Sequence, residues 1–309
     1  MKSTYVYLTG GLGNQLFQVA AALSYCQANE ENIILDTSLG RPRTTGEIAD
    51  LLHMKLPSNI TDYSSRASLL SQKAAGFLLR MGIDPTPLEK RAFVRFIFQI
   101  SGQIIFSLRY RKLISLQISK NVGFAELDAK ADSLLLGYFQ SYRYLQNPNV
   151  KCALDAIRPK SESGKLNLLI SKALEQKPIF VHLRLSDYLN EEHFGTPGSG
   201  YYSKSLAKLG GGSRNIWVFS DDMALAKSRM PTEFSSQYFY VDDSELSPAQ
   251  LLHLLRYGED YVIANSSFSW WGAALSLNQD SKVIAPEPWF AGMAEPKDLL
   301  PPNWHREKA

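Results

Sequence analysis

The feature that most constrains the fold is a regular alternation of strand-like and helix-like segments in the second half of the chain. Short runs of β-branched and aromatic residues predict strands at residues 179–185, 216–219, 238–241, 261–264 and 282–285. Apolar residues recur at helical spacing between them, at residues 202–208, 223–229, 248–255 and 269–277. Such alternation predicts an α/β unit with a largely parallel sheet, in which ligands bind beyond the carboxyl ends of the strands.

The first half of the chain carries the same signals less regularly. Strands are expected at residues 5–8, 33–35 and 133–136, with a helical pattern over residues 16–28. A long, basic, helical region is expected before the third strand, up to about residue 120. The segment 146–165 is polar and contains two prolines, as linkers often do, so we expect two domains, residues 1–150 and 151–309.

The composition is that of an ordinary globular protein, because 45% of the 309 residues are hydrophobic and 20% are charged. The net charge of +3 is too small to indicate nucleic-acid binding, and no uncharged apolar stretch is long enough to predict a membrane span. The first residues, MKSTYVYLTGG, are too polar for a signal peptide. Cys26 and Cys152 suit a reducing compartment with both thiols free and buried, so we expect a cytoplasmic protein.

The basic charge is concentrated in residues 66–120, which carry ten basic residues against Asp84 and Glu89 and therefore a net charge of +8. The segment is also apolar, and its polar side chains at positions 95, 99 and 103 recur at helical spacing. One interpretation is a packed pair of amphipathic helices with a solvated face. The other is a docking surface for anionic lipid or a lipid-linked substrate, which would place the protein at the inner face of the cytoplasmic membrane.

A glycine-rich turn follows the first expected strand and leads into a helical pattern. Its glycine and amide positions include Gly11, Gly13, Asn14 and Gln15. The turn is similar to the dinucleotide fingerprint G-x-G-x-x-G, but Leu16 stands in place of the last glycine and only Asp36 ends the second strand. Two interpretations stay open: a tight turn in which Asn14 bonds the local backbone, and a loop that faces a ligand.

The strand at residues 179–185 places His182 and Arg184 on one face, about 7 Å apart, and Leu185 on the other face. A strand in a buried sheet seldom carries a histidine and an arginine together without a partner for their polar atoms. A diphosphate is one partner that fits the arginine fork, and a carboxylate in a structural ion pair is the alternative. Asp187 follows where the strand ends.

Two more polar motifs follow predicted strands of this half. Asp221 and Asp222 come after the second strand, where they can cap a helix or accept hydrogen bonds from a ribose or a guanine. Residues that can cap a helix or bind phosphate follow the fourth strand, namely Asn265, Ser266, Ser267 and Phe268. Trp270 and Trp271 come next, as core residues or as an aromatic platform. Together the motifs predict a pocket for a nucleotide or a nucleotide sugar, and the sequence has neither a P-loop nor a His/Cys cluster with metal-ligand spacing.

Five motifs of this chain occur in the same order in the bacterial α-1,2-fucosyltransferases, and the chain resembles that family over residues 8–275. The motifs are TGGLGNQLFQVAAAL, GYFQSYRYL, VHLRLSDY, VFSDD and IANSSFSWWGAAL. More remotely, the chain is similar to the α-1,6- and protein O-fucosyltransferases. The resemblance implies two Rossmann-like lobes of GT-B type, with an acceptor-side N-terminal lobe and the donor pocket in the C-terminal lobe. It implies transfer of L-fucose from GDP-fucose to the 2-hydroxyl of a galactose-terminated glycan without metal or other cofactor, and the expected acceptor is an O-antigen precursor.

The resemblance also assigns roles to residues of the VHLRLSDY motif. Arg184 would lie against the donor diphosphate with His182 beside it, and Asp187 would complete the motif. The family usually reads His-x-Arg-Arg-Gly-Asp-Tyr, whereas this chain has Leu185 and Ser186 in place of the second arginine and the glycine. Because alternation turns position 185 away from His182 and Arg184, we expect the missing arginine to affect packing more than phosphate binding.

The other motifs supply the remaining contacts that the resemblance implies. Ser266 and Ser267 would hold phosphate, and Asp221 or Asp222 would hold the nucleoside. The glycine-rich turn with Asn14 would face the cleft from the first lobe.

The implied reaction is a single displacement with inversion, in which the acceptor hydroxyl attacks as GDP leaves. Asp187 is the first candidate for the general base, a phosphate oxygen of the donor is another, and further rivals are Glu191, Glu192 and His193. Other functions stay open: a nucleotide-sugar-binding protein without catalysis, a glycosyltransferase with a different donor sugar, a nicotinamide-dependent enzyme and a membrane-surface interaction protein.

Overall fold

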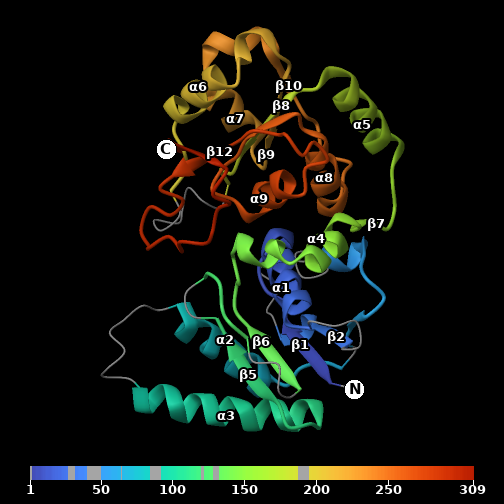
Figure 1. The fold of residues 1–309 in the computed structure, drawn as a ribbon, viewed down its shortest axis with the longest axis vertical. Helices are drawn as coiled ribbons and strands as arrows, with labels where there is room; N and C mark the ends of the chain where they lie inside the picture. The colour runs from blue at the N-terminus through green and yellow to red at the C-terminus, as the bar shows by residue number, and fades with distance from the viewer. Residues whose placement is uncertain are drawn as a thin grey trace. The chain divides into compact units, whose positions relative to one another are not determined.

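The computed structural model describes residues 2–26, 32–39, 50–63, 65–83, 92–119, 122–127, 132–186 and 195–309 (Figure 1). Contacts divide the chain into two compact units, and the division falls inside the polar segment 146–165. Unit 1 comprises Met1–Ile157 with Pro296–Leu299, and unit 2 comprises Arg158–Glu295 with Leu300–Ala309. Each unit is built on its own parallel sheet, which confirms the prediction of two α/β lobes.

The sheet of unit 2 has the order β10-β9-β8-β11-β12-β13 and is parallel throughout. Its strands are β8 (Ile179–Leu183), β9 (Ile216–Ser220), β10 (Tyr238–Tyr240), β11 (Asp260–Val262), β12 (Val283–Glu287) and β13 (His305–Lys308). Counted along the chain within the unit, this order is 3-2-1-4-5-6, which is the order of the Rossmann fold. The order reverses between β8 and β11, so residues beyond the carboxyl ends of these two strands lie where such folds bind ligands.

Four of the five helices that the structure describes in unit 2 begin at a side chain that satisfies a free N–H group of the first turn. The five helices are α5 (Gly164–Gln176), α6 (Ser199–Lys208), α7 (Met223–Arg229), α8 (Pro248–Leu254) and α9 (Ser267–Ala274). Ser163, Asp222, Ser247 and Ser266 cap α5, α7, α8 and α9 in turn, each by accepting a hydrogen bond from a backbone N–H of the first turn. The caps at Asp222 and Ser266 explain the short polar residues that follow β9 and β11.

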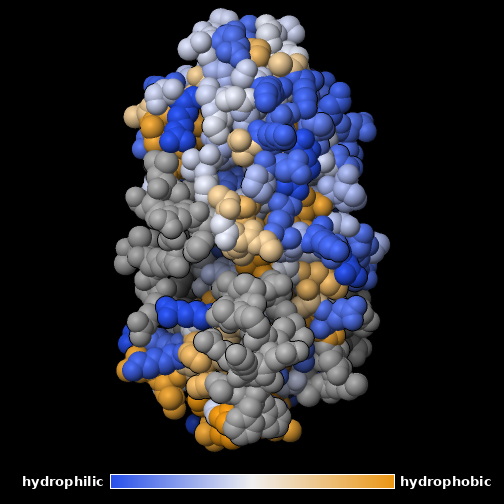
Figure 2. Space-filling view, turned by 90° about the vertical axis from the view of Figure 1, so that its left-hand side faces the viewer, coloured by the Kyte–Doolittle hydropathy of each residue, from blue (hydrophilic) through white to orange (hydrophobic). Residues whose placement is uncertain are grey.

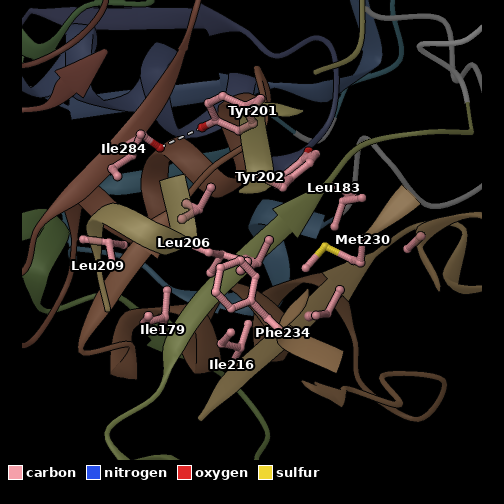
Figure 3. Packing of buried hydrophobic residues seen from close by; sticks show 14 of the residues in the cluster. Ile179, Leu183, Tyr201, Tyr202, Leu206, Leu209, Ile216, Met230, Phe234 and Ile284 are labelled. Carbon is pink, nitrogen blue, oxygen red and sulfur yellow. Dashed lines mark hydrogen bonds between the residues drawn. The ribbon is translucent and has the colours of Figure 1, made fainter. Parts of the chain in front are cut away.

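Two different cores cover the faces of the unit 2 sheet. On one face, Leu183 and Leu185 are buried in a cluster with residues of α6 and α7 (Figure 3). The Tyr201 hydroxyl of α6 lies 2.9 Å from the Ile284 carbonyl oxygen (Figure 3). It also lies 2.7 Å from the Ile263 carbonyl oxygen, so this side chain ties the end of β11 to β12. Aromatic rings fill the other face, where Phe180 contacts Trp217, Phe219 and Tyr261. His182 shares this second face, as the alternation along the strand predicts.

The sheet of unit 1 has the order β4-β2-β1-β6-β5 and is also parallel. Its strands are β1 (Ser3–Tyr7), β2 (Asn32–Asp36), β4 (Ile60–Asp62), β5 (Ser115–Ile118) and β6 (Ser133–Leu136). The helices are α1 (Leu12–Tyr25), α2 (Leu69–Ile83), α3 (Ala92–Tyr110) and α4 (Pro148–Asp155). The order reverses between β1 and β6, so the glycine-rich turn and the GYFQSYRYL motif lie at the switch point of this unit.

Short elements complete the chain. The two-residue strands are β3 (Met54–Lys55) and β7 (Arg158–Pro159). The 3₁₀ turns are Thr37–Leu39, Asp50–His53, Tyr142–Gln146, Gly211–Ser213, Thr232–Gln237 and Leu255–Tyr257. No helix in the described ranges is both long and apolar enough to cross a membrane.

Three expectations about unit 1 need correction. The basic helical region does not run to about residue 120, because Arg111 has a φ of 52° and ends α3, and the chain then forms β5. The first helix begins at Leu12 rather than at residue 16, which puts Asn14 and Gln15 inside its first turn. Both thiols are free, but only Cys26 is buried, and Cys152 is exposed.

A buried ion pair fixes α3 to the sheet of unit 1. Asp36, at the end of β2, is fully buried, and Arg109 donates to its Oδ2 from Nε at 2.9 Å and from Nη2 at 2.7 Å. The Tyr110 hydroxyl donates to the same oxygen at 2.7 Å, and Ser38 donates to Oδ1 from its hydroxyl at 2.8 Å. Because each carboxylate oxygen has partners, the buried charge is compensated only while Arg109 stays in place.

We therefore expect Arg109→Leu to lower the free energy of unfolding by about 3–5 kcal/mol, because it leaves the Asp36 charge buried without its cation. The measurement is urea denaturation of the purified protein. Lys151→Leu is the matched control, since the ion pair of Lys151 with Asp155 in the same unit is 30% and 40% exposed and is worth at most about 1 kcal/mol. Equal losses in the two variants would contradict the role of the buried pair.

Candidate functional site

His182 and Arg184 lie at the carboxyl end of β8, beside the switch point of unit 2. His182 is 7% exposed, and its ring centroid is 6.1 Å from that of Phe268 at the start of α9. The Arg184 side chain is 31% exposed, so it reaches the surface beyond the strand. Leu185 is 1% exposed and belongs to the core on the opposite face, which confirms the predicted alternation along this segment.

Asp221 closes the turn that follows β8. Its Oδ1 accepts a hydrogen bond from the Leu185 N–H at 2.8 Å, and its Oδ2 accepts from the Ser186 N–H at 3.2 Å and from the Ser186 hydroxyl. The Arg184 Nε lies 3.3 Å from the same Oδ2. Of the two partners predicted for Arg184, a diphosphate and a carboxylate, the structure shows the carboxylate. Burial raises the pKa of Asp221, but the bonds from Ser186 and Leu185 and the charge of Arg184 outweigh it and hold this pKa below its ordinary value.

Asp222 serves a different purpose from its neighbour. Its side chain accepts a hydrogen bond from the Leu225 N–H at 2.9 Å and caps α7. Its own N–H donates to the Ser220 hydroxyl at 3.1 Å. Of the two predicted roles for Asp222, the structure therefore shows the helix cap.

The start of α9 lies at the end of β11, across the switch point from His182. Ser266 is buried and caps the helix by accepting from the Phe268 N–H at 3.3 Å, and Ser267, half-buried, is its first residue. Asn265 is buried and donates from Nδ2 to the carbonyl oxygens of Gly195 and Trp289, both at 3.1 Å. The site edge of unit 2 therefore brings together His182, Arg184, Asp221 and the start of α9.

The two tryptophans that follow are core residues, and the aromatic platform is a wrong interpretation of them. Trp270 and Trp271 are fully buried, and their ring centroids are 4.8 Å apart. Neither ring has surface on which a ligand can stack.

The His182 imidazole is neutral at ordinary pH. Burial first, and then the nearby charge of Arg184, lower its pKa to about 4, while Asp221 opposes the shift. Its Nδ1 is buried and makes no hydrogen bond to any other described residue. A neutral imidazole carries one N–H donor and one acceptor nitrogen, so His182 can exchange a hydrogen bond with a ligand without carrying charge.

In unit 1, the glycine-rich turn is held by amide side chains. Gly10 has a φ of 73°, which favours glycine, and its carbonyl oxygen accepts from Gln15 Nε2 at 2.8 Å. Gln15 is fully buried, so this side chain supports the turn and has no surface for a substrate. Asn14 is half-buried, and its Oδ1 accepts from Gln140 Nε2 at 2.8 Å. Gly11 is the N-cap residue of α1, and Gly13 is buried in its first turn.

Two partners of the predicted residues were missed from sequence. Gln140 stands in the GYFQSYRYL motif and bonds Asn14, and Ser186 bonds Asp221. Order along the chain indicated both motifs, but only the fold brings these side chains together. Asp36 is bound to Arg109, so it is not available to bind a ribose, and the nicotinamide interpretation of this turn loses its acidic residue.

Asp187 and its three rivals for the role of general base lie outside the described residues. The rivals are Glu191, Glu192 and His193. Within the part of the chain that the structure describes, no group of three or more His, Cys, Asp or Glu side chains is arranged to hold a metal ion.

Comparison with known proteins identifies the family. The family model described as "Glycosyl transferase family 11" matches residues 90–308, more than half of the chain. The chain belongs to glycosyl transferase family 11. The match includes four of the five motifs on which the resemblance rested, so the predicted family and the prediction of a glycosyltransferase are confirmed.

Individual proteins are also similar to this chain over most of the length of both. An "O-antigen biosynthesis glycosyltransferase WbnK" of Escherichia coli is 26% identical over 317 residues, which covers 97% of this chain and 99% of the relative. An "Alpha-1,2-colitosyltransferase" of Escherichia coli is 28% identical over 298 residues, which covers 92% and 91%. The crystal structure of fucosyltransferase NodZ from Bradyrhizobium is similar with a TM-score of 0.47 and 12% identity, over 88% of this chain and 92% of that one.

The burial of His182 predicts a pH dependence of stability. An unfolded histidine titrates near 6.5, so between about pH 6.5 and 4 the unfolded chain binds a proton that the folded site does not. The free energy of unfolding should therefore fall as the pH drops through this window, with the full contribution of His182 present above it. His182→Gln should remove about 2–3 kcal/mol of the decline between pH 7 and 4.5.

Urea denaturation at the two pH values is the measurement, and His53→Gln on the surface is the control. Burial and the charge of Arg256 also lower the pKa of His253 to about 4. His253 therefore causes a separate fall in the free energy of unfolding at low pH, which His182→Gln does not remove. An unchanged pH dependence in His182→Gln would show that the folded site accepts the proton.

Proposed function

We propose that this glycosyltransferase moves L-fucose from GDP-fucose to the 2-hydroxyl of a β-galactoside in an O-antigen precursor. The observation that carries the proposal is the position of Arg184 and His182 at the carboxyl end of the switch-point strand in a sheet of Rossmann order. The names of the two relatives from Escherichia coli, one in O-antigen biosynthesis and one an α-1,2-colitosyltransferase, support the pathway and the linkage.

The donor diphosphate is assigned to Arg184 and the start of α9. An arginine fork matches two phosphate oxygens, and the first N–H groups of a helix attract anions. The hydroxyls of Ser266 and Ser267 can each donate a hydrogen bond to phosphate, because the Ser266 oxygen uses only its acceptor side to cap the helix.

Asp221 is proposed as a positioning residue rather than a contact to the nucleoside. Its carboxylate holds the Arg184 guanidinium by Nε and fixes the backbone of the turn at Leu185 and Ser186. A guanidinium held in this way loses less conformational freedom when its terminal nitrogens meet the diphosphate.

The proposed reaction is a single displacement with inversion at the fucose anomeric carbon. The acceptor 2-hydroxyl oxygen forms the new bond to this carbon as the bond to the GDP phosphate oxygen breaks, and the hydroxyl proton passes to a base. Negative charge grows on the departing phosphate, where Arg184 and the N–H groups of α9 stabilise it. Asp187 and a phosphate oxygen of the donor are the candidates for the base. No metal or other cofactor has a step in this scheme.

The donor sugar is the part of the proposal with a specific alternative. Colitose is fucose without its 3-hydroxyl, and one relative is named as a colitosyltransferase. A site that hydrogen-bonds the 3-hydroxyl rejects colitose strongly, whereas an apolar site accepts both sugars.

The direct test is calorimetric titration with GDP-fucose in EDTA, followed by transfer to lactose. We expect saturable binding of GDP-fucose without added metal and no binding of NAD. Arg184→Ala should lower transfer by about 10²–10³-fold, because it removes charge stabilisation from the leaving phosphate. Lys165→Ala is the control, since it removes a cation that pairs with exposed Asp242 on the same unit.

Failure of the protein to bind GDP-fucose would overturn the donor assignment. Binding and transfer of the corresponding colitose donor in its place would support the alternative. Transfer by Arg184→Ala above about a tenth of the wild-type rate would show that Arg184 does not stabilise the leaving phosphate.

A second comparison tests Asp221. Asp221→Ala should raise the KM for GDP-fucose at least about tenfold, because about 1.4 kcal/mol of binding is lost when Arg184 is no longer held. Asp222→Ala should cost about 1 kcal/mol of stability through loss of the α7 cap and change this KM little. Steady-state kinetics and urea denaturation of both variants are the measurements. An equal rise of the KM in Asp221→Ala and Asp222→Ala would show that Asp221 only stabilises the fold and does not position Arg184.

A further inference from the structure

The helix α3 of unit 1 is apolar on two opposite faces. One face packs on the unit, where Gly102 lies against Leu78 and Phe106 is fully buried in the core. A helix turns about 100° per residue, so a stripe at positions 97, 100, 104 and 108 points away from Phe106. The side chains of this stripe are Ile97, Ile100, Ile104 and Leu108, exposed by 45%, 42%, 56% and 75%.

The apolar surface continues past the end of the helix. Leu113 is 78% exposed, and a shallow groove runs along the stripe to Ser107 and Arg111. Figure 2 shows hydrophobic residues on the surface of unit 1, in the part of the unit that contains α3 in Figure 1. Single exposed leucines are ordinary on a protein surface, but a contiguous row on one helix face indicates an interaction site.

The charge in the described parts of α2 and α3 and in the residues next to them has one sign. The described segments 65–83 and 92–119 contain no acidic residue. Two of their cations are engaged elsewhere, because Arg109 pairs with Asp36 and Lys112 pairs with Asp132. Arg111 is exposed and lines the groove beside the stripe, and Arg66, Lys73 and Arg80 are exposed elsewhere in these segments.

We propose that α3 docks on the surface of an anionic lipid bilayer, with its axis along the membrane and the 97–108 stripe in the interface. Apolar side chains enter the headgroup boundary while the basic residues remain near the anionic headgroups. A second copy of this face is the poorer occupant, because it would bring like charges together without an acidic residue in these segments to compensate them.

The structure also explains why α3 can be presented rigidly. The Arg109–Asp36 pair anchors its carboxyl end to β2, and Gly102 lets the helix approach Leu78 closely. A helix fixed on one face keeps its opposite face available to a membrane without unfolding. This proposal concerns the location of the enzyme and does not depend on which sugar it transfers.

The test is co-sedimentation of the purified protein with vesicles of phosphatidylglycerol and phosphatidylcholine in a 3:7 ratio, and with pure phosphatidylcholine. We expect binding to the anionic vesicles to be at least about tenfold stronger and to weaken at high salt. The double variant Ile104→Glu/Leu108→Glu should lose this binding at least about tenfold, since it puts charge on the inserted face. Leu168→Glu/Leu174→Glu on α5 is the matched control, because its side chains are 74% and 60% exposed on unit 2.

Three results would overturn the proposal: no binding of the wild type to anionic vesicles, equal binding of the Ile104/Leu108 variant, or a wild-type dimer that this variant converts to monomers. Circular dichroism checks that the variants fold, and the milder Leu108→Ser should weaken vesicle binding if the double variant is unstable. Transfer to the water-soluble acceptor lactose, measured in parallel, reports on the proposed reaction separately.

Discussion

The carboxylate of Asp221 is the constraint on which the site edge of unit 2 depends. The backbone N–H groups of the turn beyond the end of β8 have no strand partner, and buried N–H groups need acceptors. Asp221, which follows β9, supplies two oxygens to the turn after β8, so one side chain joins the ends of two adjacent strands. Hydrogen bonds to a charged acceptor are stronger than neutral ones, and this turn is where Arg184 must be held.

Unit 1 solves the same geometric problem with neutral side chains. Its switch point lies between β1 and β6, and Gln18 bridges the two strand ends by donating to the carbonyl oxygen of Gly137 at 3.0 Å and accepting from the Thr9 N–H at 3.1 Å. Asn14 and Gln140 add a second amide bridge between the same two motifs. An amide side chain can donate and accept hydrogen bonds at once, so it suits a place where one strand end offers an N–H group and the other a carbonyl oxygen. A carboxylate suits the turn in unit 2, where the three groups that bond Asp221 all act as donors.

The sequence predicted the central strands of both sheets because these carry the strongest apolar signal. Strand β6 and helix α7 were predicted with their observed bounds, and β8 with its two different faces. The edge strand β13 was missed because its sequence HREK is entirely polar, and β5 was absorbed into a helical region. Edge strands bury less surface than central ones, so their sequences need not be apolar.

The site was predicted as a set of residues but not as a set of roles. Asp222 and Ser266 both cap helices in the structure, and the same residue types at a strand end also bind ribose or phosphate. Gln15 is a residue type that often contacts ligands, but here its side chain is buried under the turn. Which role a polar side chain takes depends on partners far along the chain, as with Asp36 and Arg109, which are 73 residues apart. Spacing in one sequence does not contain that information.

The departure from the usual family motif can be understood from the two faces of this strand end. Leu185 occupies a site that is 1% exposed, in the same core as Leu183 and residues of α6 and α7, where an arginine would have to bury a charge or displace the chain. Ser186, in place of glycine, adds a hydroxyl that donates to Asp221. The apolar residue thus strengthens the core beneath the turn, and the serine adds a hydrogen bond above it that glycine cannot make. Both residues contact groups that position the turn carrying Arg184, and neither removes a group from the face on which His182 and Arg184 lie.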